Sequence, residues 1–153
     1  MKANELRCKD LMIGDWVMVN DIEHAHPLQV AELFMKSGTL YATLYWDGMP
    51  YNVNPETLTA DVDKVLPIPL TPEILEKNGF VENRGVTSWK FETDREDLID
   101  IYGVKDYHLS INIEDTHGSG KGYRWMLNNL TIFYVHQLQH ALRLCGIEKT
   151  IEL

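Results

Sequence analysis

The segment Tyr107–Glu114 alternates strictly between apolar and polar residues, and this pattern constrains the fold more than any other in the chain. The apolar face would carry four residues: Tyr107, Leu109, Ile111 and Ile113. The opposite face would carry His108, Ser110, Asn112 and Glu114. A period of two residues is typical of a half-buried antiparallel strand. We therefore expect a sheet with one apolar face that another element must cover.

The tail TIFYVHQLQHALRLCG predicts the element that covers this face. Its apolar residues recur at helical spacing, and Gly146 is a natural C-cap. They are Tyr134, Val135, Leu138, Ala141, Leu142 and Cys145. We expect this helix to pack on the sheet, with Cys145 as a small buried apolar residue.

A shorter helix is predicted within LPIPLTPEILEKNGF. Thr71 is a good N-cap, Pro72 fits the first helical position, and Glu73 favours the positive end of the helix. Asn78-Gly79 would end the helix after two turns.

Short strands are expected before this helix and between the two helices. The first group comprises Gly14–Val19, Leu28–Met35, Thr39–Trp46, a return strand in MPYNVN after Asp47-Gly48, and Lys64–Ile68, with a turn over 54–63 before the last. The second comprises Val86–Glu92, Leu98–Tyr102, Tyr107–Glu114 and Tyr123–Leu127. We therefore predict an α+β fold. An SH3-like small β-barrel would span residues 1–67. An antiparallel sheet packed by the short helix and the C-terminal helix would span residues 68–153.

Composition limits the classes of partner. The chain has 153 residues, of which 44% are hydrophobic, and a net charge of −9 that both halves share. A uniformly acidic surface disfavours broad binding to nucleic acid or to anionic lipid. The sequence contains no apolar run of membrane-spanning length and no signal peptide, so we expect a cytoplasmic protein. Cys8 and Cys145 do not form a disulfide framework.

The clearest candidate for a metal site is the pair His136 and His140. Their spacing places both imidazoles on one side of a helix, as in two-histidine zinc sites. Hydrolases of that type need a glutamate after the first histidine, and this position is Gln137. The run from Asp21 to His26 offers a second set of donors that is more typical of a solvated turn. We expect no metal and no other cofactor.

Other catalytic patterns are weak or missing. GSGKG lacks the hydroxyl residue after its lysine and the following helix of a phosphate loop. The acidic series Glu92, Asp94, Glu96, Asp97 and Asp100 lacks the glycine and terminal glutamate of a calcium loop, and we expect a solvated face. No serine lies in G-x-S-x-G. The sequence therefore gives no indication of an enzyme.

Aromatic and basic residues are the candidates for ligand binding. The first part of the chain is dense in aromatic residues: Trp16, Tyr41, Tyr45, Trp46 and Tyr51. These residues either fill a small core or leave some, such as Trp46 and Tyr51, in an outer groove for a peptide or a base. In the second part, Trp89 and Trp125 are candidates for stacking, with Lys121 and Arg124 as a local basic site.

Three segments carry a resemblance. ELRCKDLMIGDWV, IPLTPEILEKNGF and YVHQLQHALRLCG occur in this order. Together they resemble a group of small uncharacterised proteins from prophages and other mobile elements of gut anaerobic bacteria. The group brings no established activity, cofactor or catalytic residue. Its last motif has asparagine where this chain has His140, which weakens the two-histidine metal hypothesis.

Three hypotheses for the function follow. The first is a non-enzymatic accessory protein of a phage or mobile element that binds another protein. The second is a binder of a small ligand or nucleotide, with a counter-defence role that sequesters a signal. The third is a metal-dependent hydrolase that uses His136 and His140. The oligomeric state stays open.

Overall fold

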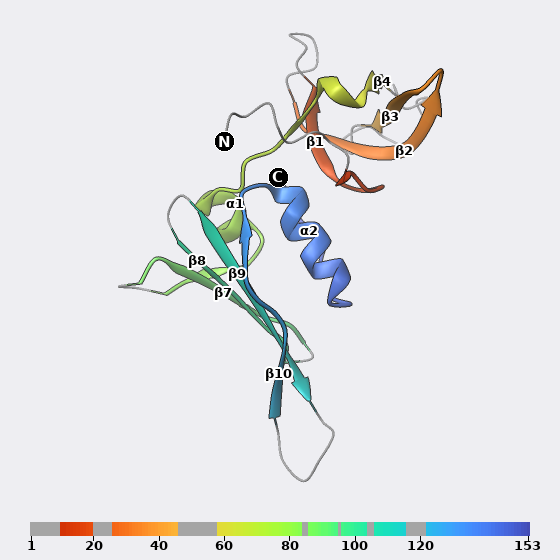
Figure 1. Cartoon of the computed structure of the whole chain (residues 1–153). Helices are drawn as coiled ribbons and strands as arrows, with labels where there is room; N and C mark the ends of the chain where they lie inside the picture. The colour runs from red at the N-terminus through yellow and green to blue at the C-terminus, as the bar shows by residue number, and fades with distance from the viewer. Residues whose placement is uncertain are drawn as a thin grey trace. The chain divides into compact units, whose positions relative to one another are not determined.

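The computed structural model describes residues 10–19, 26–45, 58–83, 86–94, 96–103, 106–115 and 122–153. The chain divides into two compact units, Met1–Ile68 and Pro69–Leu153. Each unit contains one five-stranded antiparallel sheet, and the second unit also carries two α-helices (Figure 1). The predicted α+β class is confirmed.

Unit 1 is a sheet in the order β4-β3-β2-β1-β5. Its strands are β1 (Trp16–Val19), β2 (Leu28–Lys36), β3 (Thr39–Tyr45), β4 (Leu58–Asp61) and β5 (Val65–Pro67). Val17, Val30 and Leu44 are completely buried and belong to one apolar core. No closed barrel is detected among the strands that the structure describes, so the SH3-like part of the expectation stays a prediction.

One prediction in unit 1 is wrong. The segment 54–63 was expected to be a turn, but Leu58–Asp61 forms β4, which pairs with β3 from Leu44↔Leu58 to Tyr41↔Asp61. A short 3-10 helix, η3 (Val62–Lys64), then leads into β5. Alanine and aspartate have low strand propensity, so the four residues of β4 carry no local sequence pattern that predicts a strand. Pairing with β3 determines their conformation. The return strand expected in MPYNVN lies outside the described residues.

Unit 2 is a sheet in the order β10-β9-β8-β7-β6. Its elements along the chain are α1 (Pro72–Lys77), β6 (Val81–Glu82), β7 (Ser88–Glu92), β8 (Leu98–Tyr102), β9 (Tyr107–Asp115), β10 (Gly122–Ile132) and α2 (Val135–Leu144). Figure 1 shows α2 along one side of the sheet formed by β7 to β10. The expected strands of this unit are confirmed, and β10 is longer than its predicted range.

The predicted capping of α1 is confirmed. The Thr71 hydroxyl accepts a 3.4 Å hydrogen bond from the backbone N–H of Ile74, and Pro72 is the first helical residue. Backbone N–H donation and the Thr71 side chain hold the pKa of Glu73 below its usual range. Gly79 adopts a φ of +80°, and the chain then turns into β6.

The face covered by α2 is the apolar face expected from the alternation. Tyr107, Leu109 and Ile111 of β9 are buried, as is Leu138 of α2. The opposite face differs from the prediction, because Ser110 and Asn112 are buried as well.

The C-terminal segment after α2 is anchored to α1. The Asn78 side chain donates to the carbonyl of Glu152 at 2.7 Å and accepts from the backbone N–H of Glu152 at 2.8 Å. Ile147 and Ile151 of this segment are buried. Residues 150–153 form no strand.

Within the described residues, neither helix is long and apolar enough to cross a membrane.

Candidate binding surfaces of the second unit

The β9–β10 hairpin extends beyond the rest of the sheet. The ladder between β8 and β9 ends at the pair Leu98↔Asn112. The ladder between β9 and β10 continues to Asp115↔Gly122. The end of the hairpin is therefore a two-stranded ribbon, and it reaches past the end of α2 in Figure 1.

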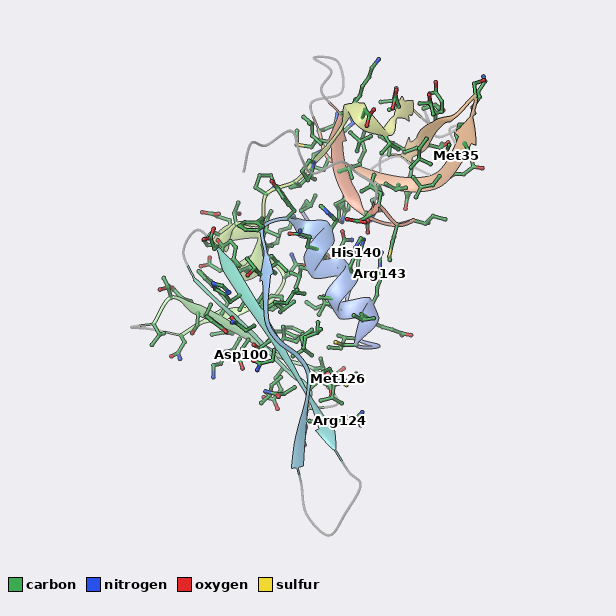
Figure 2. The ribbon with its side chains drawn as sticks, in the orientation of Figure 1. Met35, Asp100, Arg124, Met126, His140 and Arg143 are labelled. Atoms are coloured by element: carbon green, nitrogen blue, oxygen red, sulfur yellow. The ribbon has the colours of Figure 1, made fainter. Side chains whose placement is uncertain are left out.

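A row of exposed side chains follows β10. Arg124, Met126 and Leu130 are all exposed, and Met126 and Leu130 show 40% and 42% of their surface. The Arg124 Nη2 lies 3.8 Å from the Met126 Sδ, so these two side chains lie together on the ribbon (Figure 2). We call the outer edge of β10, with these three side chains, the β10 edge.

A bulge interrupts β10 within this edge. The register with β9 shifts between Leu127 and Leu130, and Asn129 has a φ of +58°. The backbone N–H of Asn129 donates to Ser110 Oγ at 3.1 Å, and Tyr102 Oη donates to Asn129 Oδ1 at 2.8 Å. Side chains of β8 and β9 thus hold the bulge, and the bulge accounts for the burial of Ser110.

The β10 edge is the longest sheet edge among the described strands. The opposite edge of its sheet is β6, with 2 residues. The edges of the sheet in unit 1 are β4, with 4 residues, and β5, with 3. An edge strand presents backbone N–H and C=O groups that another extended segment can pair with. The edge strand β10 is 11 residues long.

A cavity of about 410 Å³ forms a second candidate site in the same unit. The turn after β7 and the segment after α2 form its walls. The lining residues are Phe91, Thr93, Asp94, Asp97, Gly146, Ile147, Glu148, Lys149 and Thr150. This volume lies within the range of pockets that bind small ligands.

The turn between β7 and β8 is held by Thr93 and Asp97. The Thr93 hydroxyl accepts from the backbone N–H of Asp97 at 3.1 Å and donates to its Oδ2 at 3.1 Å. The backbone N–H of Thr93 donates to the carbonyl of Asp97 at 3.0 Å. The Asp97 side chain is thereby fixed and buried at the cavity, with 7% of its surface exposed.

An ammonium group already lies on the aromatic wall of the cavity. The Lys149 Nζ is 4.1 Å from the centre of the Phe91 ring, a cation–π contact. Burial lowers the pKa of Lys149, and the charge of Glu152 partly opposes this shift. The Phe91 ring also packs against Phe80, with ring centres 5.3 Å apart.

The end of α2 forms the other wall. Gly146 has a φ of +70°, and the backbone N–H of Ile147 donates to the carbonyl of Leu142 at 2.9 Å, which closes the helix. Cys145 is a buried free cysteine, as expected. Burial and, to a smaller extent, the Asp97 charge raise the pKa of its thiol.

The structure describes the side chains of two predicted ligand residues, Trp89 and Arg124, and places them apart. Trp46, Tyr51 and Lys121 lie outside the described residues, as does the side chain of Trp125. Trp89 is 3% exposed and contacts Tyr107 edge to face at 5.7 Å. Arg124 lies on the projecting ribbon, and β9 and β8 separate its strand from β7 in the sheet order. These residues stay predictions, although a ligand that stacks on Trp89 would require the core to open.

The histidine pair contributes to packing. His136 is buried between Tyr134, stacked at 5.8 Å, and His140, in edge contact at 5.6 Å. No group of three or more metal-ligating side chains occurs among the described residues. Gln137 is a helix cap, because its Oε1 accepts from the backbone N–H groups of Phe133 at 2.7 Å and Tyr134 at 3.2 Å.

Sequence reasoning missed the cavity. Asp97 belongs to an acidic series that was expected to form a solvated face, yet it is buried. No local sequence pattern relates Phe91, in a strand, to Lys149, in a segment near the C-terminus. The fold alone brings them together.

No family model, curated protein or solved structure matches the chain.

Proposed function

We propose that the chain is a non-enzymatic binding protein, and that its second unit binds an extended segment of another protein along the β10 edge. The observation that carries this proposal is the long, exposed edge strand β10, compared with the short edge strands β4, β5 and β6 of the described sheets. Addition of a strand to a sheet edge is a recurrent mode of peptide recognition.

Backbone hydrogen bonds would supply most of the affinity. The described part of β10 is exposed at Arg124, at Met126 and over 128–131. Its ribbon end has β9 as a neighbour on one side in the sheet order, so an added strand would extend the sheet by one member. The bulge at Asn129 divides the edge and gives it a defined register.

Side chains would supply the selectivity. Met126 and Leu130 offer apolar contacts, and the thioether of methionine adapts to varied partners. The guanidinium of Arg124 favours a carboxylate in the bound segment. The preferred partner is therefore an extended segment with alternating apolar residues and one acidic residue opposite Arg124.

Unit 1 belongs to the same proposal as an SH3-like interaction module. The strand order β4-β3-β2-β1-β5, with a 3-10 turn before the last strand, supports this comparison. The resemblance to proteins of mobile elements supports a role as an accessory protein that binds a partner encoded by the element or its host. The metal-dependent hydrolase stays a hypothesis with no additional support from His136 and His140.

Selection from a displayed library of random short peptides tests the proposal. We expect enriched peptides of extended type with an acidic residue. Met126→Lys or Leu130→Lys should weaken their binding at least about tenfold, since a lysine on an edge strand opposes pairing with a further strand.

Two matched variants serve as controls. Met35→Lys alters another exposed methionine on a strand, and Leu144→Lys alters an exposed leucine at the end of α2. Both should bind the selected peptides as the original protein does. Failure to enrich any peptide, or equal binding by the β10 variants and the controls, would refute the proposal.

A further inference from the structure

The cavity at the end of α2 has an unequal distribution of charge. Its described lining contains three carboxylates, from Asp94, Asp97 and Glu148, and one ammonium, from Lys149. Asp97 is buried, whereas Asp94 and Glu148 are exposed. The C-terminal end of α2 adds partial negative charge, because its last carbonyl groups lie there. The cavity therefore favours a cationic ligand with one charge inside and another at the mouth.

The contact between Lys149 and Phe91 shows what the aromatic wall accepts. The ammonium lies 4.1 Å from the ring centre, although it is partly removed from water. A ring that holds a tethered ammonium can hold a free one, or the alkyl chain that carries it. Lys149 is a flexible side chain and can leave the ring when a ligand enters.

The walls are fixed before a ligand arrives. Thr93 holds Asp97 on one side through hydrogen bonds of 3.1 Å to its backbone N–H and carboxylate. The segment that carries Lys149 is tied at one end to α2, through Ile147 and Leu142, and at the other end to Asn78. A preformed site loses little conformational entropy when it binds.

We propose that this cavity binds a short aliphatic diamine or polyamine. One ammonium group of the ligand binds Asp97, the second binds Asp94 and Glu148 at the mouth, and the methylene chain lies over Phe91. A dication matches the excess of two negative charges in the described lining. This site is separate from the β10 edge, and neither proposal depends on the other.

Calorimetric titration with 1,4-diaminobutane tests the proposal. We expect saturable binding that exceeds any effect of potassium chloride at matched ionic strength. The zwitterion 4-aminobutanoate should bind at least about tenfold more weakly, because its carboxylate meets the acidic mouth. Absence of saturation, or equal binding of the zwitterion, would overturn the assignment.

Variants locate the site. Asp97→Asn keeps an acceptor for Thr93 and should weaken diamine binding at least about tenfold. Asp100→Asn is the matched control, since Asp100, labelled in Figure 2, is not among the lining residues and pairs with Lys90 at 3.5 Å. This variant should bind as the original protein does. Lys149→Gln vacates the ring and should strengthen binding about threefold. If Asp97→Asn fails to fold, weaker or unchanged binding by Lys149→Gln overturns the proposal by itself.

Discussion

The phenolic oxygen of Tyr102 donates a 2.8 Å hydrogen bond to Asn129 Oδ1, and so connects β8 to β10 across β9. Asn129 is the residue with positive φ in the bulge of β10, and its backbone N–H is bound by Ser110. The conformation of the exposed edge thus depends on two residues of the neighbouring strands.

Replacement of Tyr102 by phenylalanine should loosen this bulge. We expect Tyr102→Phe to lower the free energy of unfolding by about 0.5–1 kcal/mol, because one solvent-exposed hydrogen bond is lost. In this variant, the backbone amides of β10 should also exchange with deuterium faster than in the original protein, and this increase should be larger than any increase in β8. Urea denaturation and exchange mass spectrometry measure the two effects. Unchanged exchange in β10 would mean that the bulge does not depend on this bond.

Two substitutions of Gln137 should differ in their effect on stability. Gln137→Ala removes the cap that accepts from Phe133 and Tyr134, and should cost about 1 kcal/mol of stability. Gln137→Glu keeps the acceptor and adds a negative charge at the positive end of α2, so its stability should equal or exceed that of the original. Urea denaturation compares them. Equal losses in both variants would contradict a capping role.

The Cys145 thiol should react slowly at neutral pH. Burial, and then the Asp97 charge, raises its pKa above the ordinary value of 9.0, so the folded protein holds the thiol proton more tightly than the unfolded chain. The free energy of unfolding should therefore fall as the pH rises above about 9. Alkylation followed by peptide mass spectrometry distinguishes Cys145 from Cys8. Asp97→Asn should lower this pKa, and faster alkylation at pH 8 would show it.

We expect the side chain of Asn78 to make a large contribution to the stability of the C-terminal segment. Its amide donates to Ile74 at 2.8 Å and to Glu152 at 2.7 Å, and it accepts from Glu152. Asn78→Ala should cost about 2–3 kcal/mol, since it removes three partly buried hydrogen bonds and leaves their backbone partners unsatisfied. Limited proteolysis should then cleave the segment after α2 first. If the variant resists proteolysis as well as the original protein does, the apolar contacts of Ile147 and Ile151 are sufficient to hold this segment in place.

Elements with local signals were predictable from the sequence. The N-cap Thr71, Pro72 and the turn glycine Gly79 specify α1 within one short segment. The alternation of Tyr107, Leu109 and Ile111 likewise defines β9 and its buried face. In each case the residues that determine the structure are neighbours in the sequence.

Features that depend on distant residues were not predictable. Strand β4 forms because β3 pairs with it, and Ser110 is buried because the bulge of β10 covers it. The cavity requires Asp97 and Lys149 to meet, and only the packing of the C-terminal segment against α1 achieves this. The β10 edge also depends on distant residues, since the order of the strands in the sheet determines which strand lies at its edge.

Amide exchange on the complex with a selected peptide tests the central claim most directly. If the peptide adds to the β10 edge, slowed exchange should appear in the backbone from Arg124 to Ile132, with little change in β6 or in unit 1. Protection that is confined to β4, β5 or β6, or that is missing from β10 at saturating peptide, would contradict it.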